Sequence, residues 1–310
     1  MRNRHNEDRY NKMIRQIKGV CLLALPQSAA KILELSRDDK NGPREYAAVI
    51  STDLGLTTQI LRFVNSSFFG FRNRITTIQN ALSLVYGRTI KNFVIWNAVF
   101  AMLPNPRCGP FELKKICQDA IRRGIFARLF GSHIPDQDPE ELFLCALFQD
   151  TALPILAQAW PTEYEKILVL RQQKKRRLSE LEDEVFGWNH AVVGAFLVDE
   201  WGFTEDFEDA IINHIEPVGN IDIQTCDAKT VRNAIVAMSG LLPSVIDDSW
   251  DEADEFFSMF SRLASPGMPR PHELFEQVEH QLPELAAISQ LGPVTNSLLH
   301  FHKQWLETIA

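Results

Sequence analysis

The clearest helical pattern in the chain lies in Asp138-Pro139-Glu140-Glu141-Leu142-Phe143-Leu144-Cys145-Ala146-Leu147-Phe148-Gln149-Asp150-Thr151-Ala152-Leu153-Pro154. Asp138 is suited to cap a helix, Pro139 to occupy its first position, and Glu141 to interact with the positive end of the helix dipole. The pattern predicts a helix that begins at Pro139.

One face of this predicted helix is apolar except for its last member. Phe143, Ala146, Leu147 and Asp150 follow one another at i, i+3, i+4 and i+7, so their side chains share one side. A carboxylate at the end of a core-facing stripe has to be hydrogen-bonded, paired, protonated or bound to a metal, because burying it bare costs too much free energy. Asp150 is therefore the first candidate functional residue.

The composition narrows the class of protein. The chain has 310 residues, 45% of them hydrophobic, which is enough for one large domain or two packed lobes. Its formal net charge of −8 argues against nonspecific binding to nucleic acid or to anionic membranes, so neither is expected as a partner.

The cysteines and the hydropathy pattern bear on location. The five cysteines are odd in number and far apart, which predicts reduced thiols and no zinc site; they are Cys21, Cys108, Cys117, Cys145 and Cys226. The N-terminus has no apolar core of signal-peptide length, and no run of about 18 apolar residues occurs. We therefore expect a cytoplasmic protein.

Helical patterns fill the first third of the chain. After a lead-in of residues 1–12, which we expect to be frayed, apolar residues recur at helical spacing. Asp53 is predicted to cap one helix and Thr77 another, which Gly87 would close. These helices form a predicted N-terminal lobe of residues 13–103.

A second lobe is predicted after residues 104–110, where three prolines and a glycine mark a boundary. We assign residues 111–217 to this lobe and residues 218–310 to a C-terminal helical extension that packs on it through Trp250 and nearby phenylalanines. Strand-like alternation is absent over any useful length. The predicted fold is therefore all-α, with two packed helical lobes.

Within the second lobe, several residues are expected to begin helices. Asn189 and Thr204 are predicted N-caps, and Ser179 with Glu182 has the spacing of a capping box.

Two histidines of the second lobe resemble Asp150 in their placement. His190 and His214 each fall in register with the apolar face of a predicted helix. If the three helices converge, one carboxylate and two imidazoles would form a ligand set suited to Fe, Mn or Zn. Each histidine could instead be a core residue that donates to a backbone carbonyl.

An ordered set of residues gives the chain its resemblance to a known family. In the first lobe the set comprises Leu25-Pro26, Ile50 to Leu56, Leu61 to Ser66, Ile75, Ile78 and Ala81-Leu82. In the second lobe it comprises Phe143 to Asp150, Glu184, Gly187, His190, Gly194, Trp201, Ala210 to His214 and Pro217. With this set the chain resembles the HDOD (HD-related output domain) family, a branch of the HD-domain superfamily. The resemblance runs from about residue 20 to residue 217 and implies an HD-like helical bundle for the second lobe.

The resemblance also implies where metal ligands would stand. Catalytic HD phosphohydrolases hold metal ions with a histidine on an early helix, a His-Asp pair, and later His and Asp residues. The matching positions here carry Asp119 for the early histidine, Gln149-Asp150 for the pair, and Met238-Ser239 near the late aspartate. A neutral amide is a poor ligand for a transition metal, and an incomplete set does not readily activate a water for attack on a phosphoester.

The resemblance therefore implies a noncatalytic regulatory protein of bacterial signal transduction that acts through protein partners. Asp119, Asp150, His190 and His214 would be a vestigial metal site, with no cofactor expected beyond residual Fe, Mn or Zn. The predicted interaction surface is Asp53, Asn65 and Ser66, at helix ends near the cleft between the lobes. These three residues would serve equally well as caps and turn residues.

Two other functions stay open at this point. One is a metal-dependent phosphohydrolase acting on a cyclic dinucleotide or another phosphoester, with Asp119 as a substitute oxygen ligand. The other is a module that binds a small signalling nucleotide, supported by the basic run Lys174 to Arg177. That run also suits the negative end of a helix dipole.

Overall fold

The computed structural model describes residues 12–17, 24–38, 40–66, 69–85, 87–216, 225–244 and 246–309. Nearly all of the predicted lead-in, together with Cys21 and Pro217, lies outside these residues. Within them no strand forms, and the only bridge pairing joins Cys108 to Phe111. The all-α prediction is confirmed.

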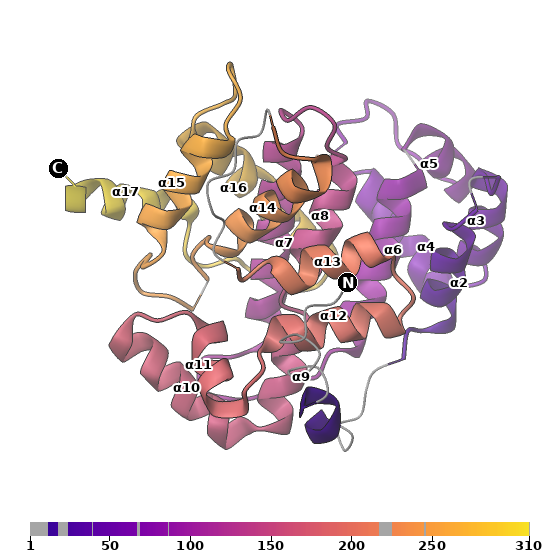
Figure 1. The fold of residues 1–310 in the computed structure, drawn as a ribbon. Coiled ribbons are helices and arrows are strands. Elements are labelled where there is room, and N and C mark those ends of the chain that lie inside the picture. Colours follow the sequence, from indigo (N-terminus) through magenta and orange to yellow (C-terminus); the bar gives the residue numbers. More distant parts are fainter. Residues whose placement is uncertain are drawn as a thin grey trace.

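Five helices on one side of the molecule form the first lobe (Figure 1). They are α2 (Gln27–Leu35), α3 (Pro43–Ile50), α4 (Leu54–Val64), α5 (Ile78–Leu84) and α6 (Gly87–Met102). Their core is rich in stacked aromatic rings: Phe63 and Phe93 lie 4.2 Å apart between ring centroids. Since α6 also packs against α8, this lobe is joined to the next through an apolar contact.

The second lobe is built around two long central helices, α7 (Leu113–Gly131) and α8 (Pro139–Phe148), which pack closely on each other. Around them lie α9 (Ala152–Ala159), α10 (Pro161–Lys174), α11 (Leu178–Phe186), α12 (His190–Glu200) and α13 (Glu205–Asn213). Gly124 permits the close approach of α7 and α8, because a Cβ atom there would lie 3.0 Å from the Phe143 carbonyl oxygen.

The C-terminal helices are α14 (Ala228–Gly240), α15 (Ala253–Leu263), α16 (Pro271–Ile288) and α17 (Leu298–Ile309). Two of them, α14 and α16, pack on α7, while α15 packs on α14 and α17 on α16 (Figure 1). Phe126 of α7 contacts Phe256 and Phe275, with ring centroids 5.4 and 6.3 Å away. The extension thus shares one hydrophobic core with the second lobe.

Buried polar side chains of α7 also hold the extension. The Arg122 guanidinium, fully buried, donates to the carbonyl oxygens of Pro243 and Asn296. One turn earlier, the Gln118 amide donates to the Pro293 carbonyl at 3.0 Å. These bonds fix the segments before α15 and α17 against the second lobe, since a buried guanidinium needs its partners.

The predicted helix starts are mostly confirmed. Side chains of the five expected caps accept hydrogen bonds from backbone N–H groups of the first turn; they are Asp53, Thr77, Asp138, Asn189 and Thr204. Two predictions are wrong. Gly87 opens α6 instead of closing α5, because α5 already ends at the extended residue Val85.

The capping box is the second wrong prediction. Helix α11 begins one residue before Ser179, with extended Arg177 at its N-cap, so Ser179 lies inside the first turn. Glu182 consequently faces the interior and is fully buried.

The predicted helix from Pro139 ends earlier than the apolar stripe suggested. A window within Pro139–Ala159 is apolar enough to cross a membrane, but 89% of it is buried inside the structure, as in a core helix. A turn at residues 149–151 divides it into α8 and α9. Pro154 explains the break, because it has no N–H and its ring excludes the carbonyl of Asp150 four residues earlier. Asp150 therefore lies in a turn.

Candidate functional site

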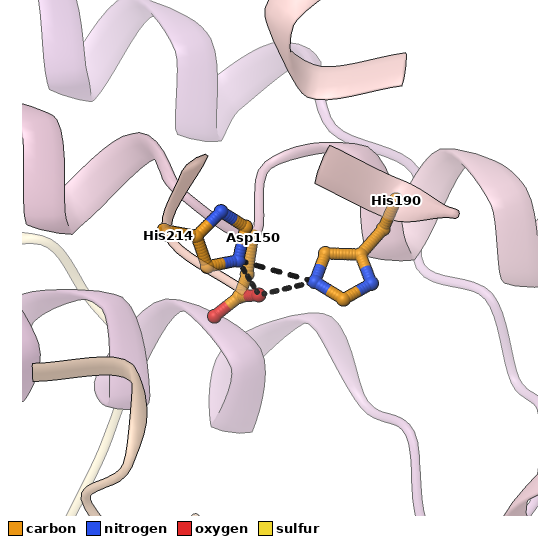
Figure 2. Close-up of side chains that lie close together, drawn as sticks. All are labelled: Asp150, His190 and His214. Carbon is orange, nitrogen blue, oxygen red and sulfur yellow. Dashed lines mark hydrogen bonds and ion pairs between the residues drawn. The ribbon is translucent and has the colours of Figure 1, made fainter. Parts of the chain in front are cut away.

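Three polar side chains from different parts of the second lobe meet at one point (Figure 2). Asp150 comes from the turn between α8 and α9, His190 from the first residue of α12, and His214 from the end of α13. All three are buried, and one ligand atom of each lies within 4.8 Å of the others. The convergence on which the predicted ligand set depended is present.

The distances in this cluster suit a single metal ion. The Nε2 atoms of His190 and His214 are 3.2 Å apart, and they lie 3.3 and 3.6 Å from Asp150 Oδ1. Ligands bound to one ion at about 2.1 Å are separated by roughly 3.0–3.5 Å, so the spacing matches. This cluster could bind a metal, with two imidazoles and one carboxylate as donors.

His214 is held with its Nε2 atom turned into the cluster. Its Nδ1 atom donates to the carbonyl oxygen of Ile211 at 2.6 Å, which leaves the lone pair on Nε2. Burial lowers the pKa of His214 well below its usual range, and the neighbouring His190 adds to this effect. His214 is thus neutral, the form that can act as a ligand.

Glu182 orients His190, a role that was not among the predictions from the sequence. Glu182 Oε2 accepts from both the backbone N–H and Nδ1 of His190, at 2.8 and 2.6 Å. Its other oxygen accepts from the Tyr164 hydroxyl at 2.5 Å, and burial followed by the charge of Glu182 raises the pKa of Tyr164. A carboxylate that fixes one histidine nitrogen and so aims the other is the usual support of a metal-binding histidine.

A sequence signal for Glu182 exists. Leu178, Glu182 and Phe186 fall at i, i+4 and i+8, which places Glu182 on the apolar face of its helix.

Two positions that the resemblance assigns to metal ligands are bonded to each other. The Gln149 side chain donates from Nε2 to Ser239 Oγ at 3.3 Å, and Ser239 Oγ donates in turn to the Val236 carbonyl. Both side chains are fully buried. Gln149 and Ser239 lie beside His214. Both side chains are neutral, whereas the resemblance implied a histidine and an aspartate at these positions.

Asp119 is not brought into the cluster. Its carboxylate accepts a hydrogen bond from Ser244 Oγ and lies 3.7 Å from the Arg122 guanidinium. It faces the same cavity as Asp150, from α7, but does not belong to the group of three ligand atoms.

An arginine outside the predicted site, Arg123, pairs with Asp150. Arg123 stands one turn after Asp119 on α7, and its guanidinium forms an ion pair with Asp150 Oδ2. Burial lowers the pKa of Arg123, against the raising influence of Asp119 and other carboxylates, but a guanidinium stays charged in proteins. The spacing of Asp119 and Arg123, i and i+4, was the available signal.

A cavity of about 120 Å³ is lined by Asp119, Arg123, Asp150, His190 and His214. One wall comes from α7 and the turn before α9, and the opposite wall from α14 and the segment after it, with Gly240 and Ser244. Arg171, Arg177 and Glu252 complete the charged lining. Phe111, Ile116 and Leu153 are among its apolar residues. The C-terminal extension is therefore part of the cavity wall.

The basic residues at the end of α10 form ion pairs with acidic neighbours. Lys175 pairs with Asp251 at 2.9 Å, Arg176 with Glu184 at 2.8 Å, and Arg177 with Glu255 at 2.7 Å. Arg171, one turn earlier, pairs with Asp247. Pairing of this kind is typical of a solvated helix end.

The three residues of the predicted interaction surface make local contacts and do not line this cavity. Asp53 caps α4 by accepting from the Leu56 N–H at 3.0 Å. The Asn65 amide bonds to the backbone of Ile75 in both directions, at 2.7 and 2.8 Å, and Ser66 is buried. Asp53 and Asn65 are exposed at the two ends of α4.

Comparison with known proteins shows which family and fold the chain is similar to. Over 194 residues, 61% of this chain, the sequence is 26% identical to an uncharacterised protein of Treponema pallidum (strain Nichols), and the match spans 37% of that protein's length. The chain thus spans well under half of the curated relative that it matches.

Two solved structures share the fold. One, from Shewanella amazonensis SB2B, carries the name of a candidate phosphohydrolase; it has a TM-score of 0.68 and 18% identity, over 90% of this chain and 97% of that one. The other, from Marinobacter aquaeolei VT8, is named as a candidate signal transduction protein; it has a TM-score of 0.64 and 19% identity, over 93% of this chain and 65% of that one. The family profile of the HDOD domain matches residues 22–217. This chain belongs to the HDOD domain family.

Proposed function

We propose that this protein is a noncatalytic, cytoplasmic HDOD protein of signal transduction, which regulates by contact with other proteins. The Asp150–His190–His214 cluster is then the remnant of an HD metal site, and the protein needs no metal cofactor. The observation that carries the proposal is the hydrogen bond between Gln149 and Ser239.

This hydrogen bond matters because its two partners occupy positions at which the resemblance implies metal ligands. A hydrolase of the HD type needs ions that lower the pKa of a bridging water, and each ion needs several charged or imidazole donors. A primary amide and an aliphatic hydroxyl bonded to each other offer neither. Asp119, the remaining candidate, is engaged by Ser244 and Arg122. Three donors remain, enough to hold a single ion but not a pair of ions that share a bridging water.

The spacing of the three remaining donors favours a second candidate function, metal-dependent phosphoester hydrolysis. Elemental analysis of protein purified without chelator, run beside turnover of a cyclic dinucleotide and of a chromogenic phosphodiester, separates the two. Our proposal expects Fe, Mn and Zn well below one ion per chain and no turnover above that of a D150A variant. Stoichiometric metal with turnover that D150A abolishes would establish the hydrolase instead.

The region that we propose for protein contact is the exposed end of α4 around Asp53. Leu54, directly after it, is 81% exposed, an unusual position for a large apolar side chain. Asn65 and Ser66 at the other end of α4 would hold the adjacent loop in place. We expect a partner to cover Leu54 and to bond to the charged cap.

A pull-down from the native host tests this surface with matched variants. L54D places a charge at the proposed contact, whereas V169D does the same at Val169 on α10, which is 51% exposed and remote in sequence. Proteins retained by wild type and V169D but lost with L54D would support the surface. Equal retention by all three would contradict it.

A further inference from the structure

The charge balance around Arg123 points to a role for this residue that rests on the proposed function above. Arg123 projects from α7 into the cavity and pairs with Asp150, the central carboxylate of the cluster. The side chains of both residues are largely buried, at 14% and 11% exposed. The pair therefore lies in a medium where uncompensated charge is costly.

The acidic groups around this guanidinium outnumber the free cations. Besides Asp150, the carboxylates of Asp119, Asp247 and Glu252 act on Arg123. Arg171 forms an ion pair with Asp247, and the Arg122 guanidinium lies 3.7 Å from the Asp119 carboxylate. Burial raises the pKa of Glu252, against the opposite influence of the Arg171 guanidinium 3.9 Å away, which Glu252 shares with Asp247. Arg123 is thus the cation that neutralises Asp150.

This cation lies next to the place that a metal ion would take. Asp150 Oδ1 faces the two histidine Nε2 atoms, while Oδ2 of the same carboxylate carries Arg123. An ion bound to Oδ1 would sit within a few ångströms of a positive guanidinium. Like charges this close repel each other strongly, even at the effective dielectric constant of a protein surface.

We propose that Arg123 is a built-in replacement for a metal ion: its guanidinium neutralises Asp150 and keeps divalent cations out of a site whose three remaining donors are otherwise well placed. The cluster is then stable without a cofactor, and it binds a metal ion tightly only when the charge of Arg123 is removed. The chemical class of ligand that the opened site takes is a divalent transition-metal ion, because two imidazoles and one carboxylate are its donors.

Replacing Arg123 tests this directly. R123M keeps an unbranched apolar stem of similar reach and removes the charge, and R123K keeps a charge. The control is R177M, which removes a second arginine of the same cavity, one that pairs with Glu255. The probes are Zn²⁺ and Mn²⁺ alone by titration calorimetry and Co²⁺ by visible absorption, on the full chain.

We expect R123M to bind one ion per chain at least about a hundredfold more tightly than wild type, because a full repulsive charge is gone. R123K and R177M should behave like wild type. A folded R123M that binds no ion would overturn this inference and leave the proposed function standing. Wild type that binds one ion as tightly as R123M would overturn the inference too, and with phosphodiester turnover it would also overturn the proposed function.

The experiment stays decisive if R123M does not fold. R123Q, neutral but polar, then takes its place with the same expectations. If neither folds, refolding is compared with and without Zn²⁺: recovery only with the ion supports the inference, since the ion supplies the missing charge. No recovery in either condition contradicts it.

Discussion

Oε2 of Glu182 lies 2.6 Å from Nδ1 of His190, and this contact joins α11 to the start of α12. The same carboxylate accepts from the His190 backbone and from Tyr164, so three buried donors depend on it. Glu182 therefore holds these buried groups of the second lobe in place, whether or not the cluster binds an ion or a partner.

Removing Glu182 should destabilise the protein strongly. E182A leaves three buried donors without an acceptor, and we expect a loss of about 3–4 kcal/mol in the free energy of unfolding, measured by urea denaturation. E182Q, which keeps the size and one acceptor, should cost about half as much. E180A is the control on the same helix, since the exposed Glu180–Arg176 pair is expected to contribute less than about 1 kcal/mol. Equal losses for E182A and E180A would refute the network.

Arg122 should be as important as a core residue. R122M removes the donors for the carbonyls of Pro243 and Asn296, and we predict a loss of about 3 kcal/mol. K115M, on the exposed side of α7, is the matched control and should change stability by less than about 0.5 kcal/mol. The measurement compares the urea concentrations at the midpoint of unfolding, with the same denaturant dependence of the unfolding free energy for both variants. Midpoints of R122M and K115M that agree within error would contradict the assigned contacts.

Cutting the chain where the family match ends should abolish cooperative folding. Residues 1–217 lack α14 to α17, which leaves Phe126 and Phe130 without their partners on α15 and α16, and leaves Arg122 buried without its acceptors. We expect the fragment to show no sharp thermal transition and to bind a hydrophobic dye. A fragment that melts cooperatively near the temperature of the full chain would show that the extension is an independent unit.

Gln149 and Arg123 should be coupled in metal binding. Q149H alone adds an imidazole donor while Arg123 still repels the ion, so we expect little gain in Zn²⁺ affinity. R123M/Q149H should exceed R123M by at least about tenfold, because the added ligand acts only once the charge is gone. Calorimetric titration of all four proteins gives the coupling. Additive effects would mean that the two positions act independently.

Local chemistry explains which features were predictable from the sequence. Asp53, Asn189 and Thr204 were identified as caps because a cap depends on its own helix turn. The burial of His190 and His214 followed from the apolar register of their neighbours. Asp150 was singled out for the right chemical reason, although its helix ends two residues before it.

The features that were missed depend on contacts between distant segments. Glu182 fitted a surface capping box in sequence, and only the fold shows that its acceptors serve Tyr164 and His190. Arg123 belongs to a helix with several basic residues, and its pairing across the cavity with Asp150 is a tertiary contact. The Gln149–Ser239 bond spans 90 residues of chain, a separation at which helical periodicity carries no information.

The central claim is that this HD-like cavity has lost metal ligands, and that Arg123 neutralises the Asp150 carboxylate in place of a metal ion. Its most direct test is the metal content of wild-type protein purified without chelator and then dialysed against Zn²⁺ and Mn²⁺, measured by inductively coupled plasma mass spectrometry beside R123M. The account predicts far less than one ion per chain in wild type and close to one in R123M. One or two ions per wild-type chain, lost on changing Asp150 to Ala, would contradict it.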